Sequence, residues 1–139
     1  MRKLKVLVAD DIEIIAKSYE RTLSENEKIE IIGLAYDGQE EYDIILEQNP
    51  DIVITDNKMP KLNGVDVIEK IHDSNLDYIP KFIIITGDAD PILLNKCNEL
   101  GVVRVLIKPI SNDKILYAVD EVIDLITEES SKYKFNENK

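Results

Sequence analysis

The chain has 139 residues, a length that suits one compact domain and leaves little room for a second folded unit. Its net charge of −11 repels nucleic-acid phosphates and anionic lipid, so we expect no direct nucleic-acid binding by this chain and no membrane partner. The hydrophobic content of 44% is enough for a core, while no apolar run approaches the ~20 residues of a membrane-spanning helix.

The N-terminus and the cysteine content indicate the compartment. Met1-Arg2-Lys3 leads into a short apolar run that ends in two acids, without a small-residue cleavage site, so we expect no secretory signal. Cys97 is the only cysteine and cannot form an internal disulfide. Both features favour a cytoplasmic location.

Short runs rich in Val and Ile alternate with segments of helical spacing along the chain. In chain order, we expect a strand at 4–9, a helix at 12–23, a strand at 29–36, a helix at 38–48, a strand at 51–55, a helix at 62–72, a strand at 81–86, a helix at 91–100, a strand at 102–107 and a helix at 112–128. Nearly continuous apolarity in the strands is typical of parallel strands that are covered on both faces.

Residues that are typical of helix ends support the helices predicted in the later part of the chain. Asp90 before Pro91 is a typical cap and first-turn proline, Gly101 suits a helix stop, and Ser111 suits an N-cap. The last residues, 128–139, are polar and lose the apolar period, so we interpret them as a fraying helix end that leads into a tail or truncated linker. This divides the chain into a domain at 1–127 and a polar C-terminal tail at 128–139.

The alternation of strands and helices predicts an α/β fold, a three-layer, doubly wound, five-stranded parallel sheet with right-handed crossovers. A closed barrel of eight strand–helix units is excluded, because it would need about 250 residues.

Polar residues follow four of the predicted strands. Asp10 and Asp11 end the first strand, Asp56 follows the third, Thr86 ends the fourth, and Lys108 follows the fifth. Because ligands of open α/β sheets bind beyond the carboxyl ends of the strands, we expect these side chains to converge at one edge. Each alone has a simpler interpretation, such as Asp10-Asp11 capping the next helix, but the set together indicates a site.

Carboxylates that crowd one site repel each other unless a cation neutralises them. Mg²⁺ fits the oxygen-rich set best, with Mn²⁺ as an alternative, because it is usually held by one or two carboxylates and a phosphate oxygen. A zinc site is disfavoured, since His72 and Cys97 are each the only residue of their kind. We interpret His72 as a surface residue at a helix end and Cys97 as a small core residue.

The remaining groups indicate phosphoryl transfer. Lys108 can act as a point charge for phosphoryl oxygens, and the Thr86 hydroxyl can donate a further hydrogen bond. The set therefore predicts Asp56 as the nucleophile.

Together these residues resemble the receiver (REC) domain of two-component response regulators, of the CheY-like chemotaxis and sporulation-regulator type. The likeness covers residues 3–127 and rests on Asp10-Asp11, Asp56, the Met59-Pro60…Gly64 loop, Thr86 and Lys108-Pro109, all in the family's order. It implies a flavodoxin-like (βα)5 sheet with strand order 2-1-3-4-5. It also implies a phosphorelay switch that catalyses only its own phosphorylation and dephosphorylation.

The resemblance assigns roles to these positions. Asp56 would accept phosphate from a histidine kinase or phosphotransfer protein, and Thr86 and Lys108 would contact the phosphoryl group. Asp11 and Asp56 would bind Mg²⁺ with the backbone carbonyl of Lys58, while Asp10 would act through water. A downstream protein would read the phosphorylated state on the face of the fourth helix, fifth strand and fifth helix.

Two features are set against the family pattern: one is Val105, and the other is the pair Lys58 and Asp88. Val105 stands where the family often has the aromatic switch residue that couples to the threonine, so the usual relay is in doubt. Lys58 and Asp88 stand at positions that flank the mouth of the site in the family, and their opposite charges could pair there and modulate phosphate lifetime.

Other functions stay open at this stage. A flavodoxin-like nucleotide binder is disfavoured because Asp10-Asp11 would repel phosphate. An aspartate-nucleophile phosphatase is disfavoured because Lys58 stands where such enzymes carry a second acid. The chain is either a stand-alone receiver or the excised receiver of a longer transcriptional regulator or hybrid kinase. Arg104, which interrupts an apolar strand, is either an edge-protecting charge or part of a partner surface.

Overall fold

The computed structural model describes residues 2–137, and their side chains up to residue 132. The elements follow one another as β1 (Leu4–Ala9), α1 (Glu13–Leu23), β2 (Ile29–Ala35), α2 (Gly38–Gln48), β3 (Ile52–Asp56), α3 (Gly64–Asp73), β4 (Lys81–Thr86), α4 (Pro91–Glu99), β5 (Arg104–Ile107) and α5 (Asn112–Glu137). The five parallel strands lie in the order β2-β1-β3-β4-β5, which confirms the predicted α/β fold and its strand order.

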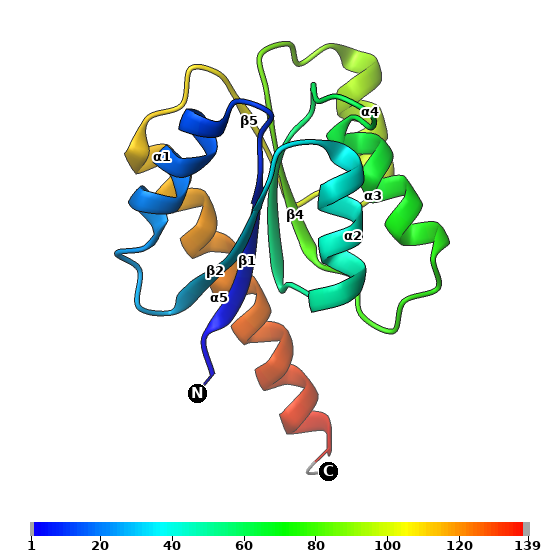
Figure 1. The fold of residues 1–139 in the computed structure, drawn as a ribbon. Helices are drawn as coiled ribbons and strands as arrows, with labels where there is room; N and C mark the ends of the chain where they lie inside the picture. Colours follow the sequence, from blue (N-terminus) through cyan, green and yellow to red (C-terminus); the bar gives the residue numbers. More distant parts are fainter. Residues whose placement is uncertain (1, 138–139) are drawn as a thin grey trace.

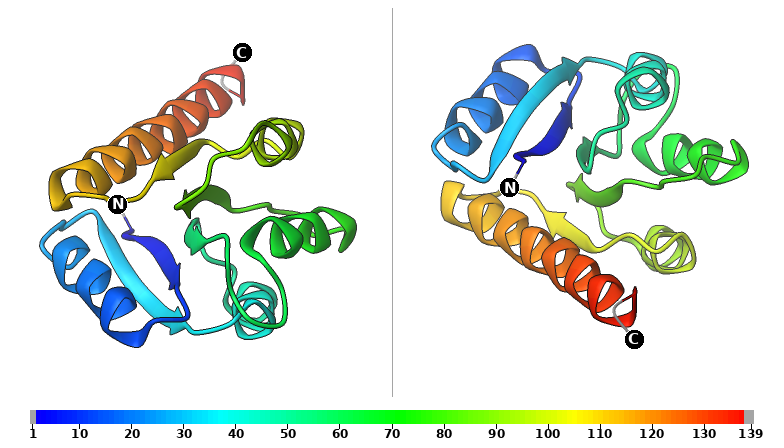
Figure 2. Two further views of the ribbon diagram at one scale, coloured as in Figure 1. Left: turned by 90° about the horizontal axis from the view of Figure 1, so that it is seen from above. Right: turned by 90° about the horizontal axis from the view of Figure 1, so that it is seen from below.

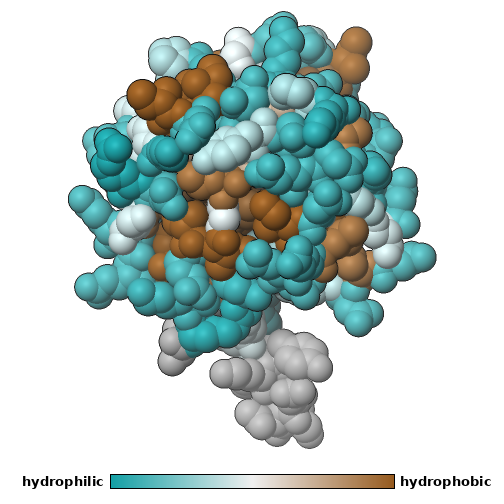
Figure 3. All heavy atoms as spheres, in the orientation of Figure 1, coloured by the Kyte–Doolittle hydropathy of each residue, from teal (hydrophilic) through white to brown (hydrophobic). Residues whose placement is uncertain are grey.

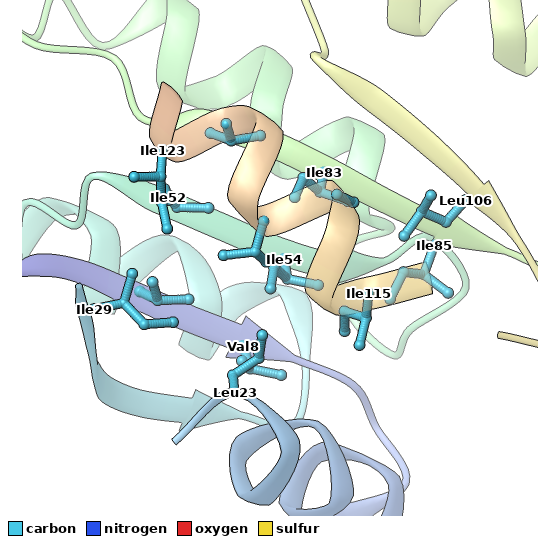
Figure 4. Close-up of a cluster of buried hydrophobic side chains, with 14 of the residues drawn as sticks. Val8, Leu23, Ile29, Ile52, Ile54, Ile83, Ile85, Leu106, Ile115 and Ile123 are labelled. Carbon is cyan, nitrogen blue, oxygen red and sulfur yellow. The ribbon is translucent and has the colours of Figure 1, made fainter. Parts of the chain in front are cut away.

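Helices cover both faces of the sheet, as Figures 1 and 2 show: α1 and α5 pack on one face, and α2, α3 and α4 on the other. Each face has its own hydrophobic core. Figure 4 shows the core beneath α1 and α5, where side chains such as Leu23 and Ile115 meet Val8, Ile54 and Ile83 from the strands. Because the central strands contribute alternate residues to both cores, they are apolar almost throughout.

Several helix ends lie where the local sequence predicts them. The Asp90 carboxylate accepts a hydrogen bond from the Leu93 N–H at 2.8 Å, and the Ser111 hydroxyl accepts one from Lys114 N–H at 3.2 Å. Gly101, just after α4, has a φ of 72°, a conformation that glycine adopts without strain.

The structure differs from the predicted boundaries by two or more residues at three element ends, and by one residue at several others. β5 begins at Arg104 rather than residue 102. α3 begins at Gly64 rather than residue 62, because Asn63 and Asp66 form a reciprocal capping box there. α5 continues to Glu137, whereas we expected the helix to end near residue 128. Residues 128–137 contain neither Gly nor Pro, so nothing in their sequence stops a helix that α5 has already nucleated.

Among the described residues, no helix combines the length and the apolar character that crossing a bilayer requires. The view in Figure 3 is mostly hydrophilic, with several hydrophobic patches, including a broad one near the middle of the molecule. The exposed apolar side chains include Ile12 and Ile14 at the start of α1, which are 48% and 77% exposed.

Candidate functional site

Three carboxylates meet at the carboxyl edge of the sheet. Asp10 and Asp11 follow β1, and Asp56 is the last residue of the adjacent strand β3. One oxygen from each of the three lies within 4.8 Å of the others. The parallel register brings together residues that are 45 or 46 positions apart in the chain, as the strand-end argument predicts.

Asp10 is the most buried of the three. Its Oδ1 accepts a hydrogen bond from the Ile12 N–H at 2.9 Å, whereas its buried Oδ2 has no partner among the described residues. Burial raises the pKa of Asp10 and the Ile12 N–H lowers it, while the neighbouring Asp56 raises it further. The N-cap of α1 is Ile12, so capping that helix does not explain Asp10.

The donor set fits a hard divalent cation. A buried carboxylate oxygen without a partner is costly unless a cation or water meets it. Asp10, Asp11 and Asp56 offer only oxygen ligands, which is the preference of Mg²⁺ and of Mn²⁺. The chemistry of these residues therefore agrees with the cation that the sequence indicates.

Lys108 completes the charged part of the site. Its Nζ donates a hydrogen bond to Asp56 Oδ2 at 3.0 Å. Burial lowers the pKa of Lys108, but the hydrogen bond and the charge of Asp56 outweigh that effect and raise it. The Lys108 N–H also bonds the Thr86 carbonyl at 2.8 Å, which holds the end of β5 beside the end of β4.

Thr86 is buried at the end of β4, but its hydroxyl is occupied by the following loop. The hydroxyl donates to the Asp88 carbonyl at 3.0 Å and accepts from the Asp88 N–H at 3.1 Å. Thr86 therefore lies beside the site, and its hydroxyl must leave the Asp88 backbone before it can donate to a group on Asp56.

The loop after β3 forms one wall of the site. Its first residue, Asn57, accepts hydrogen bonds from the Gly64 N–H at 2.8 Å, through the backbone, and from the Val65 N–H at 3.0 Å, through the side chain. These bonds fix the loop against the start of α3. Lys58 follows Asn57 and is exposed.

A cavity of about 420 Å³ opens above Asp56, and both predicted modulating residues line it. Its walls also include Thr86 and Lys108, so four of the predicted positions share one space with Asp56. Lys58 and Asp88 form no ion pair in the part of the chain that the structure describes. Their modulating role stays a prediction.

Val105 lies half-buried on β5, opposite Ile84 in the register, and packs against the core beneath α2, α3 and α4. Its aliphatic side chain has no ring that could swing between two positions. Val105 therefore does not offer the ring movement that the aromatic residue makes at this position in the family.

Three residues have structural roles. Cys97 is buried in the core, which raises the pKa of its thiol. His72 Nε2 lies 2.9 Å from the Leu100 carbonyl oxygen, so the exposed ring links α3 to the end of α4. Arg104 donates to Glu121 on α5 at 2.8 Å, which accounts for a charge in an apolar strand.

Sequence reasoning missed one buried polar pair next to the site. Glu41 on α2 and Thr55 on β3 are both fully buried, and their side-chain oxygens lie 2.8 Å apart. A signal was present, because Glu41 stands four residues before the buried Ile45 and therefore on the same helix face.

Comparisons with known proteins agree with this geometry. The response regulator receiver domain family model matches residues 6–120. The REC domain of AraT, a response regulator from Geobacillus stearothermophilus, is 26% identical with a TM-score of 0.82, over 93% of this chain and 99% of that one. The receiver domain of the Francisella response regulator 1452 is 27% identical with a TM-score of 0.77, over 89% of this chain and 99% of that one. A CheY-like receiver domain protein from Methanospirillum hungatei JF-1 is 23% identical with a TM-score of 0.83, over 92% and 99%, and shows the same fold.

Proposed function

Because this chain belongs to the response regulator receiver domain family and so is a phosphoacceptor switch, we propose that Asp56 is its phosphoacceptor. The observation that carries the proposal is the setting of the Asp56 carboxylate. It is 5% exposed at the base of the cavity, with Lys108 Nζ at 3.0 Å and two further carboxylates within 4.8 Å.

The reaction is a phosphoryl transfer from a phosphohistidine donor on a histidine kinase or phosphotransfer protein. A carboxylate oxygen of Asp56 attacks phosphorus, the P–N bond of the donor breaks, and the histidine nitrogen takes the electron pair. Lys108, which donates a hydrogen bond to Asp56 before the reaction, stays close to the transferred oxygens and offsets their charge. In this role the protein acts only on itself, in phosphorylation and in later dephosphorylation.

Mg²⁺, or Mn²⁺ in its place, would be held by Asp11, Asp56 and the Lys58 carbonyl, with Asp10 acting through water. When bound, the ion would neutralise the charge that develops on the phosphoryl oxygens. The unpartnered Oδ2 of Asp10 supports this assignment.

Phosphorylation would be reported on the face of α4, β5 and α5. This face carries exposed apolar residues that suit a protein partner: Ile92, Ile107 and Tyr117 are 82%, 49% and 64% exposed. Since Val105 has no ring to move, the change would pass through the loop after Thr86. The acidic chain would act in the cytoplasm by protein contact, without binding nucleic acid itself.

A second candidate is the receiver domain of a longer transcriptional regulator or hybrid kinase. The path of α5 favours it, because the C-terminal part of this helix runs past the end of the sheet (Figure 1). In that case residues 1–127 would be the receiver and the polar segment from residue 128 its connection to an output domain. The full open reading frame decides between the two.

The assignment of Asp56 is tested by mass. Wild type, incubated with acetyl phosphate or phosphoramidate and Mg²⁺, is expected to gain one phosphate, and Asp56→Asn none, because the amide is not a nucleophile. Intact mass spectrometry measures both. An adduct that persists in Asp56→Asn would reject the assignment, and Asp88→Asn, an exposed acid of the same cavity, is the matched control that should still be phosphorylated.

A further inference from the structure

Glu41 is a carboxylic acid in the interior of the molecule, outside the acidic site. It projects from α2, has no exposed surface and contacts the side chain of Thr55 on β3. Its Oε1 lies 2.8 Å from Thr55 Oγ1, while its Oε2 has no hydrogen-bond partner among the residues that the structure describes. An ionised carboxylate in this setting would have one bare, buried oxygen, which is far more costly than the carbonyl oxygen of a neutral acid.

The hydrogen-bond contacts of Thr55 also indicate that Glu41 is a neutral acid. Thr55 Oγ1 lies 2.8 Å from Glu41 Oε1 and 3.1 Å from the carbonyl oxygen of Asp56. A hydroxyl has one proton and can donate to only one of these two acceptors. Both contacts are hydrogen bonds at once only if Glu41 supplies a proton of its own.

We propose that Glu41 is a positioning residue for the phosphoacceptor: as a neutral acid it donates to Thr55 Oγ1, which leaves the Thr55 hydroxyl free to donate to the Asp56 carbonyl. This inference rests on the proposed role of Asp56. If Glu41 loses its proton, the Thr55 hydroxyl turns to the carboxylate and the Asp56 carbonyl loses that donor.

The surroundings of Glu41 keep the acid neutral. Burial raises the pKa of Glu41 to about 8, against a smaller opposite effect of the Thr55 hydroxyl. No charged side chain contacts Glu41 among the described residues. The titratable and charged groups of the elements packed around it are Glu40, Tyr42, Asp43 and Glu47 on α2, Lys5 on β1, Glu30 on β2, Asp56 on β3, and Asp66, Glu69, Lys70, His72 and Asp73 on α3.

The Asp56 carbonyl matters because it sits between the reacting carboxylate and the loop that carries Lys58. Gly64, at the start of α3, covers this point so closely that a Cβ there would lie 2.8 Å from the Asp56 carbonyl oxygen and 3.0 Å from Thr55 Oγ1. A rotation of the Asp56–Asn57 peptide group would therefore shift the Asp56 carboxylate together with the loop that carries Lys58. Small misplacements of a reacting group lower rates strongly.

The test measures the rate constant of Asp56 phosphorylation by phosphoramidate at saturating Mg²⁺ and pH 7, by intact mass. Glu41→Met has similar size and no donor, and Thr55→Val is isosteric without a hydroxyl. Each is expected to lower the rate constant by about tenfold, and the double variant no further, since one relay is removed. Glu41→Gln, whose amide N–H can donate to Thr55, and Thr55→Ser are expected to stay within about twofold of wild type.

A pH series separates positioning from packing. The rate constant of wild type, divided by that of Glu41→Gln, is expected to fall as the pH rises through about 8, because only wild type loses the donor there. A flat ratio, or a wild-type rate in Glu41→Met and Thr55→Val, would overturn the inference while leaving Asp56 as the phosphoacceptor. Failure of wild type to gain phosphate on Asp56 would reject the proposed function and this inference with it.

One readout does not depend on the folding of the apolar variants. The infrared difference spectrum of wild type minus Glu41→Gln at pH 7 is expected to contain the carbonyl stretch of a neutral carboxyl group. A pair of carboxylate bands in its place would overturn the inference.

Discussion

At the scale of single residues, the site is held in a resting arrangement by bonds that a phosphoryl group would have to replace. Lys108 already donates a hydrogen bond to Asp56, whereas the Thr86 hydroxyl makes two hydrogen bonds to the backbone of Asp88. The lysine is therefore prepared for the reaction, and the threonine has to break two neutral hydrogen bonds, each worth about 1 kcal/mol net.

This contrast predicts where the response to phosphate begins. When beryllofluoride, a phosphoryl mimic, binds Asp56, the Thr86 hydroxyl is expected to move to it and release the Asp88 N–H. The amide NMR signals of residues 86–90 and of the first turn of α4 should then shift, with the Asp88 amide among the largest. Thr86→Val is the control, because it cannot make the new bond; shifts confined to residues that touch the mimic would contradict the prediction.

At the scale of elements, the contact between β3 and the start of α3 sets the position of Asp56, the proposed phosphoacceptor. Gly64 allows α3 to approach the Asp56 backbone, and the Asn57 side chain and backbone then bond the first N–H groups of that helix. Gly38 serves α2 in the same way, because a Cβ there would overlap the Leu62 backbone. Both helices thus begin where only glycine leaves room.

Gly64→Ala is accordingly expected to lower the free energy of unfolding by about 1–3 kcal/mol, since the methyl group meets a backbone oxygen that cannot move aside cheaply. Denaturant titration measures the loss. Gly87→Ala is the matched control: no atom lies within 4 Å of its added Cβ, so it should change stability by less than about 0.5 kcal/mol or raise it slightly. Equal stability of the two variants would contradict the packing argument.

At the scale of the whole molecule, part of the acidic charge of the chain is gathered at one edge of the sheet. The net charge is −11, and three carboxylates share one edge of the sheet with one lysine nearby. A cation that binds there stabilises the folded state, because the unfolded chain does not hold these groups together.

Millimolar-range Mg²⁺ is therefore expected to raise the melting temperature of wild type. Asp11→Ala should abolish most of that rise, while its melting temperature without metal stays equal or increases, because one repelling charge is gone. Differential scanning calorimetry with and without the ion measures both. A wild-type curve that is indifferent to Mg²⁺ would contradict the ligand set.

Stability should also depend on pH through Glu41. The folded protein keeps this proton up to a pKa of about 8, whereas the unfolded chain releases it near 4.5. The folded state thus binds more protons between these values, and this contribution to stability is present below about pH 4.5 and is lost as the pH rises through about 8.

Glu41→Gln removes this dependence. The free energy of unfolding of wild type should fall relative to that of Glu41→Gln between about pH 4.5 and 8, by at most about 1.4 kcal/mol per pH unit. Asp51 makes stability depend on pH in the opposite direction, but it does so equally in both proteins, so its contribution cancels in the comparison. Burial tends to raise the pKa of Asp51, but hydrogen bonds from Arg2 and the Lys5 N–H lower it overall. Parallel stability curves for wild type and variant would contradict a neutral Glu41.

The sequence by itself determined the order of strands and helices and the set of residues at the strand ends. Both follow from local chemistry: apolar β-branched runs form buried strands, and in a parallel sheet the residues after such strands meet at one edge. Asp10, Asp56, Thr86 and Lys108 were found in this way, without any knowledge of their distances.

Only the tertiary structure decided how those residues are engaged. The bond of Lys108 to Asp56, the occupied Thr86 hydroxyl and the lack of an ion pair between Lys58 and Asp88 depend on side-chain directions that spacing does not encode. Glu41 is the clearest case. Along the chain it is one acid among 28 acidic residues, and its character comes from the burial that packing of α2 against the sheet imposes on it.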